Sequence, residues 1–291
     1  MRFTILAAEW NAKLVALAKV MNSKVALPIY STFLLELKDG VLRITASDMD
    51  CSRCSTLPVM DMDRANEHNG SLCVTASFLL DSLKNLGDQP VTFEADEENL
   101  SVVIRYNNGQ FDMVGFPAKD YALPGTMGKS VQVTIEASVL NDSIGKSLYA
   151  VGNDDLRPIF SGIYFTKKGD ELQCATTNGS MLVRNTYKVE NDGQEYSFLL
   201  HSRAAKIVRS MTSKSDEKVQ VFITEREVAF QTETDYFRTR LIEGKYPNYN
   251  AIIPTDSDKT AILDKNELLA AVRRVSVCLL YTSPSPRDRT R

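Results

Sequence analysis

Hydrophobic and polar residues follow two different periods along the chain. Over residues 8–21 the apolar positions recur every three or four residues, which predicts a helix with one apolar face. Over 33–37 and 41–46 they recur at every second residue, which predicts two strands, and the Asp39-Gly40 pair between them is typical of a hairpin turn. A second helix is expected after Thr75. Three more strands are expected at 91–94, 100–105 and 111–114.

The same series of elements begins again 130 residues later. Phe3-Thr4-Ile5 matches Val133-Thr134-Ile135, and Pro28–Ser31 matches Pro158–Ser161 at the same offset. A third copy starts at Ala261-Ile262-Leu263, with a helix expected over 266–275. Repeats of this length are whole domains rather than solenoid units. We expect an α+β fold, with helices lying over antiparallel sheets, divided into units at 1–127, 128–254 and 255–277.

The last fourteen residues, 278–291, break the helical pattern that precedes them. They read CLLYTSPSPRDRTR and combine two prolines with three arginines, without a capping or turn residue that would end the helix. The string resembles translated adapter sequence, so we interpret 278–291 as a non-native tail. A natural disordered tail is the alternative.

Composition narrows the class of protein. The chain has 291 residues, 43% of them hydrophobic, with 34 Lys+Arg against 37 Asp+Glu and a net charge of −3. These values exclude disordered, collagen-like and coiled-coil classes and disfavour a protein whose whole surface binds nucleic acid, although a local basic face remains possible. Five cysteines and two histidines favour a reducing compartment, and no apolar run approaches the ~18 residues of a membrane span. We expect a cytoplasmic protein without a membrane partner.

Catalytic and metal motifs are weak. Cys51 and Cys54 form a C-x-x-C to which His68 and Cys73 could be added, but residues i and i+3 of a strand point to opposite faces, which argues against zinc. The acidic pairs Asp48/Asp50 and Asp61/Asp63 lack a phosphate-binding glycine loop. No G-x-S-x-G, P-loop or H-E-x-x-H occurs. We expect no metal and no cofactor. A hydrolase or transferase with a site between domains remains a rival hypothesis.

Several stretches resemble one family. MRFTI at the start, LPIYSTFLLEL, RPIFSGIYF and LIEGKYPNYNAIIP stand in the order and at the distances found in the bacterial DNA polymerase III β subunit, the sliding clamp. The resemblance covers residues 1 to about 277. It implies clamp domains I (1–127) and II (128–254) and the truncated start of domain III (255–277). In the family two three-domain protomers close head-to-tail into a ring around duplex DNA, a contact that joins domain I to domain III.

The resemblance also implies a DNA-facing helix surface. In the predicted helix 202–211, Arg203, Lys206 and Arg209 recur every three residues without an acid, which gives one broad basic stripe. Contacts from Lys and Arg to phosphate carry no base code, which suits a ring that slides. Lys24 occupies a position where the family places an arginine at the DNA. Arg157 is a weaker candidate, because a buried structural arginine is equally compatible. A solvated helix face is the alternative for any one of these residues.

A second expected site is a groove for partner peptides. In the family, polymerase, clamp loader and repair proteins insert a short segment ending in hydrophobic residues into a groove on domain II and its border with domain III. Apolar walls and an adaptable methionine suit several partners, and a glycine permits close approach of a peptide backbone. Ser180 and Met181 depart from the His and Arg of many members. The matching positions are Phe160, Thr177, Gly179, Ser180, Met181, Leu182, Pro247 and Ile252.

The resemblance therefore implies a non-enzymatic processivity factor that tethers the replicative polymerase to duplex DNA. Its effect would be one of effective concentration rather than of tight binding. A homodimeric ring is the family's assembly. The alternative is a truncated monomeric fragment that binds partner peptides or DNA but cannot form a ring.

Overall fold

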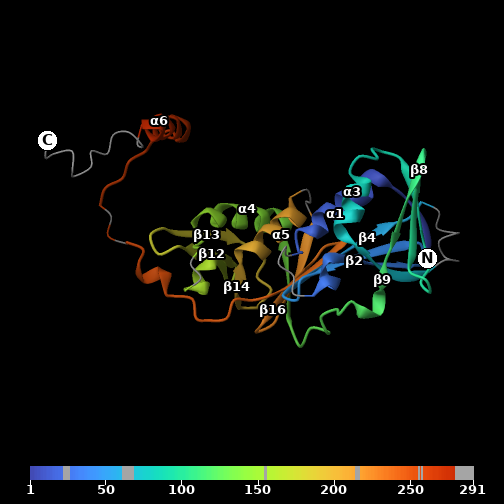
Figure 1. Cartoon of the computed structure of the whole chain (residues 1–291). Coiled ribbons are helices and arrows are strands. Elements are labelled where there is room, and N and C mark those ends of the chain that lie inside the picture. The colour runs from blue at the N-terminus through green and yellow to red at the C-terminus, as the bar shows by residue number, and fades with distance from the viewer. Residues whose placement is uncertain are drawn as a thin grey trace. The chain divides into compact units, whose positions relative to one another are not determined.

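The structure is a computed structural model that describes residues 1–21, 27–60, 69–153, 156–213, 217–254, 256 and 258–278. The chain forms two compact units, Met1–Pro247 and Asn248–Arg291. The larger unit contains two copies of one series of strands and helices (Figure 1).

The first copy begins with a strand, a helix and a short 3₁₀ turn and ends with a three-stranded meander. Its antiparallel strands and helices follow the order that the apolar periods predicted. The elements are β1 (Arg2–Leu6), α1 (Ala7–Ala18), η1 (Pro28–Ser31), β2 (Thr32–Lys38), β3 (Val41–Ser47), β4 (Cys51–Pro58), β5 (Gly70–Thr75), α3 (Ala76–Leu83), β6 (Pro90–Ala95), β7 (Ser101–Tyr106) and β8 (Gly109–Val114).

The second copy repeats this order after a linker that holds β9 (Phe116–Pro117) and η2 (Ala118–Asp120). The expected repeat is thus confirmed, while the exact domain bounds stay a prediction. Its elements are β10 (Val131–Glu136), α4 (Ala137–Ser147), η3 (Leu148–Ala150), η4 (Pro158–Ser161), β11 (Gly162–Lys168), β12 (Glu171–Thr177), β13 (Leu182–Lys188), β14 (Tyr196–His201), α5 (Ser202–Thr212), β15 (Lys218–Ile223), β16 (Glu227–Gln231) and β17 (Asp235–Arg240).

The strands form three antiparallel sheets, one of which crosses from the first copy into the second. Two four-stranded sheets have the orders β1-β6-β7-β8 and β13-β12-β11-β14. The third has nine strands in the order β10-β15-β16-β17-β4-β3-β2-β5-β9. Its centre is the pairing of β17 with β4, in which Asp235 lies opposite Ser55 and Thr239 opposite Cys51. One sheet therefore joins the two copies.

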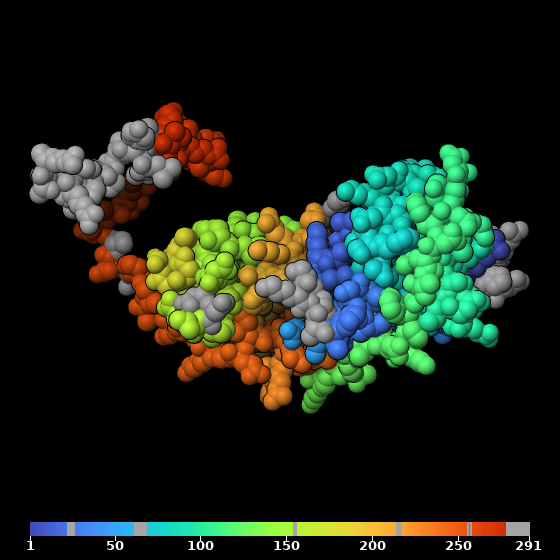
Figure 2. Space-filling view, viewed as in Figure 1, coloured from blue at the N-terminus to red at the C-terminus, as the bar shows by residue number. Residues whose placement is uncertain are grey.

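Four helices lie along one side of these sheets, α1 and α3 from the first copy and α4 and α5 from the second (Figure 1). Each helix turns one apolar face to the sheets, because its large apolar residues recur every three or four positions. Trp10, Leu14 and Leu17 of α1 are fully buried, and Phe3 and Phe93 pack against Trp10. The opposite faces of the helices carry the polar residues. Figure 2 shows both copies as one continuous surface. None of the helices in the described ranges is both long and apolar enough to cross a bilayer.

The smaller unit contains η5 (Tyr249–Ala251) and α6 (Lys265–Cys278). The helix expected over 266–275 is confirmed, and Asp264 caps it by accepting hydrogen bonds from the backbone N–H groups of Asn266 and Glu267, both at 2.9 Å. Ala261-Ile262-Leu263, where the third copy is expected to start, do not form a strand equivalent to β1 and β10, because that segment is irregular. A strand forms only where a neighbouring strand completes its hydrogen bonds, and no described strand of this unit does so.

Candidate functional site

Helix α5 presents the predicted basic stripe on its outer face. Ala204, Ala205, Ile207 and Val208 are buried against the sheets, so the intervening basic residues point away from the core. His201 caps the helix, since its Nδ1 accepts a hydrogen bond from the backbone N–H of Arg203 at 3.1 Å. Burial, and then the nearby cations, lower the pKa of His201, which keeps the imidazole neutral and able to accept.

Arg203 is engaged by the first copy of the repeat. Its Nη1 donates to Oδ2 of Asp48 at 2.5 Å, and its Nη2 donates to the carbonyl oxygen of Val20. The Asp48 side chain is only 4% exposed and the Arg203 side chain 38%, so the carboxylate is shielded from water while its cation is partly solvated. Arg203 therefore fastens α5 to the end of α1 and to the β3–β4 turn, and its charge is balanced within the protein.

Lys206 and Arg209 are exposed on the same helix. Within the described part of the chain, neither has an acidic partner. Arg209 lies against α4, where a side chain at Gly145 would bring its Cβ to 3.1 Å from Nη2 of Arg209. These two residues form the part of the stripe whose charge is available to a ligand.

The other two predicted DNA contacts do not join this stripe. The guanidinium carbon of Arg157 lies 5.1 Å from the centroid of the Phe160 ring, a cation–π contact. A Cβ at Gly179 would lie 3.7 Å from Nη1 of Arg157. Arg157 is thus placed with predicted groove residues, and its contact with DNA stays a prediction. Lys24 lies outside the described residues.

The predicted groove is built on the turn between β12 and β13. The carbonyl oxygen of Met181 accepts from Oγ1 of Thr177 at 2.7 Å, and Oδ1 of Asn178 accepts from the backbone N–H groups of Ser180 and Met181 at 2.9 and 2.8 Å. Gly179 adopts a φ of +93°, a conformation that glycine reaches without strain. The turn leaves Met181 41% exposed, with Leu182 half-buried beside it.

Phe160 reaches this turn from η4. Its carbonyl oxygen accepts from the backbone N–H of Gly152 at 2.8 Å, and a Cβ at Gly152 would meet Phe160 Cβ at 3.2 Å and Asn178 Cα at 3.4 Å. Gly152, which the sequence analysis did not single out, therefore allows η4 and the Asn178 turn to approach each other. The structure brings together Arg157, Phe160 and the turn at 177–182.

Pro247 and Ile252 lie on either side of the division between the two units. The segment before Pro247 passes η4, because a Cβ at Gly244 would lie 2.9 Å from Cγ2 of Ile159, and Tyr246 stacks on Tyr164 with centroids 4.8 Å apart. Ile252 belongs to the smaller unit, where its backbone N–H donates to the carbonyl of Tyr249 at 3.2 Å. Its membership of the groove stays a prediction.

Two clefts in the described chain lie along residues 241–246, and none of the predicted groove residues lines them. One of about 660 Å³ is lined by Lys129, Arg226, Glu227 and Arg240, among others, and one of about 550 Å³ by residues around Tyr164 and Tyr246. Both carry charges of both signs.

The cysteine and aspartate candidates for metal sites are occupied by other contacts. Burial raises the pKa values of the Cys51 and Cys54 thiols, that of Cys51 to about 12, which disfavours the thiolate that binds zinc. Asp48 pairs with Arg203, and Asp50 pairs with Arg240 at 3.2 Å. Among the described residues no group of three metal-binding side chains occurs. His68, Asp61 and Asp63 lie outside them.

Comparison with known families identifies both copies of the repeat. Residues 1–124 match the N-terminal domain of the DNA polymerase III beta subunit, and residues 134–248 match its central domain. This chain belongs to the DNA polymerase III β subunit family. The beta sliding clamp of Bacillus subtilis is 26% identical over 281 residues, which cover 95% of this chain and 74% of that protein. The beta sliding clamp of Synechococcus elongatus is 25% identical and covers 92% and 72%.

Solved structures of β clamps share the fold. The Bacillus subtilis sliding clamp matches with a TM-score of 0.87 at 24% identity, over 98% of this chain and 75% of that one. A Pseudomonas aeruginosa clamp bound to griselimycin also has a TM-score of 0.87, at 21% identity, over 95% and 74%. The expected family and α+β clamp fold are confirmed. The family is that of a polymerase accessory subunit, so the prediction of a non-catalytic protein is confirmed as well.

Proposed function

We propose that this β subunit acts as a sliding clamp, a non-catalytic factor that holds DNA polymerase III on duplex DNA. The observation that carries the proposal is the pair of β-subunit domains whose four helices lie along one side of their sheets. Such a helical face can contact the DNA backbone without reading bases. The cytoplasm, where duplex DNA and polymerase meet in a bacterium, is its proposed location.

Lys206 and Arg209 are the proposed phosphate contacts. Both are exposed, and neither is balanced by an acid in the described chain. Arg203 contributes indirectly, because its bond to Asp48 fixes α5 relative to the first copy. Contacts of this kind depend on counterion release, so they weaken with salt and permit sliding.

The groove at the 177–182 turn is the proposed site for peptide segments of the polymerase, clamp loader and repair proteins. Exposed Met181 and half-buried Leu182 offer apolar surface, and Gly179 leaves the backbone accessible. The Pseudomonas aeruginosa relative is described as bound to griselimycin, which makes that compound a suitable probe for a ligand site on this chain.

Ring closure is proposed to use edge strands. β17, the last strand of the second copy, pairs with β4 of the first, whereas the equivalent strand β8 pairs only with β7 in the described chain. The open edge of β8 can accept a strand from another protomer, as an unpaired strand edge does in general. A homodimer closed head-to-tail in this way would encircle DNA.

Retention on circular DNA tests the proposal. The chain is loaded with a clamp loader onto nicked circular duplex and separated by gel filtration at a salt concentration that suppresses phosphate contacts. A sliding clamp co-elutes with the circle and is lost when the circle is linearised. Equal retention before and after linearisation would contradict encirclement, and would instead indicate a fragment that binds DNA from one side.

A further inference from the structure

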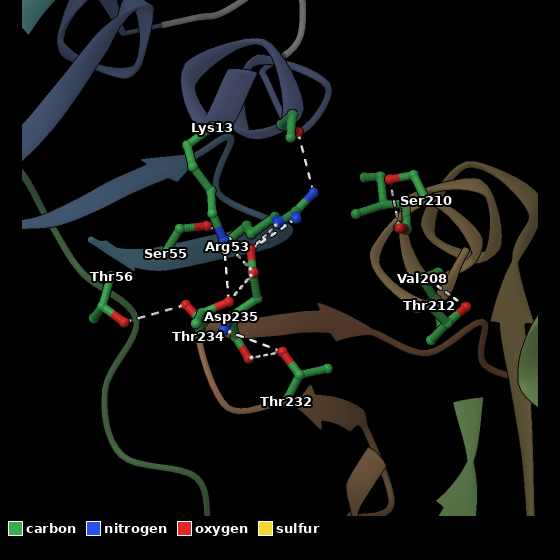
Figure 3. A network of polar contacts seen from close by, with 12 residues as sticks. Lys13, Arg53, Ser55, Thr56, Val208, Ser210, Thr212, Thr232, Thr234 and Asp235 are labelled. Atoms are coloured by element: carbon green, nitrogen blue, oxygen red, sulfur yellow. Dashed lines mark hydrogen bonds and ion pairs between the residues drawn. The ribbon is translucent and has the colours of Figure 1, made fainter. Parts of the chain in front are cut away.

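The two copies of the repeat are joined by a buried polar cluster as well as by the β4–β17 ladder. We call this the junction cluster: Lys13 on α1, Arg53 and Ser55 on β4, Thr234 before β17 and Asp235 at its start (Figure 3). Arg53 has a side chain only 4% exposed and Asp235 one of 10%. This ion pair thus lies in the interior of the junction, while Lys13, 26% exposed, and the exposed Thr234 lie towards its surface.

Both oxygens of the Asp235 carboxylate are bonded across the junction. Oδ1 accepts from Nε and Nη2 of Arg53 at 3.1 and 2.7 Å and from Oγ of Ser55 at 2.5 Å. Oδ2 accepts from Nζ of Lys13 at 3.0 Å and from Oγ1 of Thr234 at 2.9 Å. Arg53 also donates to the carbonyl of Ala16 at 3.2 Å. Donors from the first copy therefore enclose one carboxylate from the second.

The internal repeat shows which residues stand at the same places on other strands. In the first copy, Arg53 lies opposite Ala46 and Ser55 opposite Ile44. The residues 130 positions after Ala46 and Ile44 are Thr176 and Cys174. They lie opposite Val183 and Asn185 in the second copy. Hence Val183 and Asn185 of β13 occupy the positions of Arg53 and Ser55. The position of Lys13 on α1 is taken by Ser143 on α4.

The carboxylate also lacks a counterpart. In the first copy, Thr4 faces Thr92, Thr92 faces Arg105 and Arg105 faces Gln110 on successive strands. In the second copy, the equivalent pairs are Thr134 with Gln220, Gln220 with Gln231 and Gln231 with Tyr236. Gln110 is thus equivalent to Tyr236, and Gly109 of β8 stands at the position of Asp235. Neither β8 nor β13 carries its half of the junction cluster.

These two strands are also open on one side. β8 ends one sheet and β13 ends another in the described chain. Until another strand pairs with them, β8 and β13 offer a second copy of this protein edges equivalent to those of β17 and β4, respectively. When several copies fold at high protein concentration, β17 of one copy can therefore pair with β13 of another.

We propose that the junction cluster determines which strand β17 accepts, keeping it on β4 of its own chain and away from β13 of a second copy. On β13 the Asp235 carboxylate would face Val183 and Asn185. It would then be buried with no guanidinium to balance its charge. Likewise, if β8 of a second copy paired with β4, Gly109 would stand at the position of Asp235 and Arg53 would have no carboxylate partner. Discrimination by an unpaired buried charge is a general route to specificity. This inference does not rest on the proposed function.

A cross-linking reporter tests the inference in the whole chain. Cys54 lies opposite Tyr236 across β4 and β17, and Arg184 is the equivalent of Cys54 on β13. In a chain with Cys54→Ser, Arg184→Cys, Tyr236→Cys and Cys278→Ser, a short bismaleimide gives a covalent dimer when β17 of one copy lies on β13 of another. This readout is unaffected by pairing through β8. Tyr236→Cys with native Cys54 serves as the reference for the correct intrachain pair.

The reporter is compared in two backgrounds after unfolding and refolding at high protein concentration. Arg53→Met with Asp235→Leu removes the charged core of the junction cluster. Lys167→Met with Asp192→Leu removes another ion pair with a buried lysine, whose Nζ–Oδ1 distance is 2.6 Å, away from the junction. We expect at least a tenfold rise in covalent dimer in the first background and no rise in the second. Equal dimer yields in the two would overturn the proposal.

A gain-of-function variant decides the question if the first background does not refold. Val183→Arg with Asn185→Ser places the accepting half of the junction cluster on β13, in the same reporter chain with β4 unchanged. Covalent dimer above that of the reporter alone supports selection by these residues. A yield equal to that of the reporter alone overturns it.

Discussion

Arg203 on α5 donates to Asp48, 155 residues earlier in the sequence, and so connects the helix of one repeat to a turn of the other. The same guanidinium also bonds to the carbonyl of Val20. A residue that belongs to a basic stripe in sequence is thus a structural tie in three dimensions. Its neighbours Lys206 and Arg209 keep the exposed charge.

This division of roles predicts different effects on DNA binding. Changing Lys206 and Arg209 together to Ser should weaken binding of a duplex oligonucleotide several-fold and lower the slope of log affinity against log salt by about 2, since each phosphate contact contributes about 0.9. Fluorescence anisotropy over a range of salt concentrations measures both. Lys38→Ser with Lys168→Ser, on equivalent hairpins, is the charge-matched control. An unaltered slope would show that α5 does not contact phosphate.

Arg203→Ser is expected to act mainly on stability. The change leaves Asp48, whose side chain is almost fully buried, without its cation. Breaking a fully buried pair lowers the free energy of unfolding by about 3 kcal/mol, and the loss should be smaller here because Arg203 is partly exposed. Urea unfolding followed by circular dichroism measures the loss. The Lys206→Ser chain provides the comparison, and equal stability of the two would argue against the tie.

Acid should weaken the junction through Asp235. Burial alone would raise the pKa of this carboxyl, but Arg53, Ser55 and Lys13 more than offset burial and lower it to about 2. Because the folded value lies below the usual 3.8, the ionised group contributes about 2 kcal/mol above pH 4, and this contribution is lost as the pH falls towards 2.

Thermal unfolding from pH 7 to pH 2.5 measures that contribution. Asp235→Asn should unfold at a lower temperature than the unchanged chain at pH 7, and the difference should shrink below pH 4. Asp81→Asn, at an exposed position on α3, is the control. A difference that stays constant with pH would contradict the assignment.

The groove predicts an effect on ligand affinity. Leu182→Ala with Ile252→Ala should weaken binding of a clamp-binding peptide by about 1–3 kcal/mol, the range for removing buried aliphatic contacts. Isothermal titration measures it, with griselimycin as a second probe. Val114→Ala, at an exposed position on β8, is the control. Unchanged affinity in a folded double variant would remove these residues from the site.

Gly179 offers a conformational test of the same turn. Gly179→Ala should destabilise the protein by about 1 kcal/mol, because a side chain at a φ of +93° is strained although the added Cβ would meet Arg157 only at an ordinary contact distance of 3.7 Å. Gly128→Ala, where φ is ordinary and no atom lies within 4 Å of the added Cβ, is the control. Differential scanning calorimetry measures the two changes, and equal melting temperatures would contradict the strain.

Local patterns predicted most elements of the fold. The helix expected over 202–211 is α5, Ser202–Thr212, because its apolar residues recur at helical spacing. The Asp39-Gly40 turn joins β2 to β3 as expected. The pairing of β17 with β4 could not be predicted in this way, since it unites residues about 180 positions apart and depends on the packing of both copies. For the same reason the bond from Arg203 to Asp48, 155 residues apart, had no local signal.

The nine-stranded sheet has a mechanical consequence. Bending the two repeats against each other would break hydrogen bonds of the β4–β17 ladder and expose Arg53 and Asp235 at the same time. The two repeats therefore move together as one rigid body. A force on this rigid body is transmitted to its outer edges rather than absorbed at the β4–β17 junction. Any flexing of an assembly built from this chain would then concentrate at contacts beyond β8 and β13.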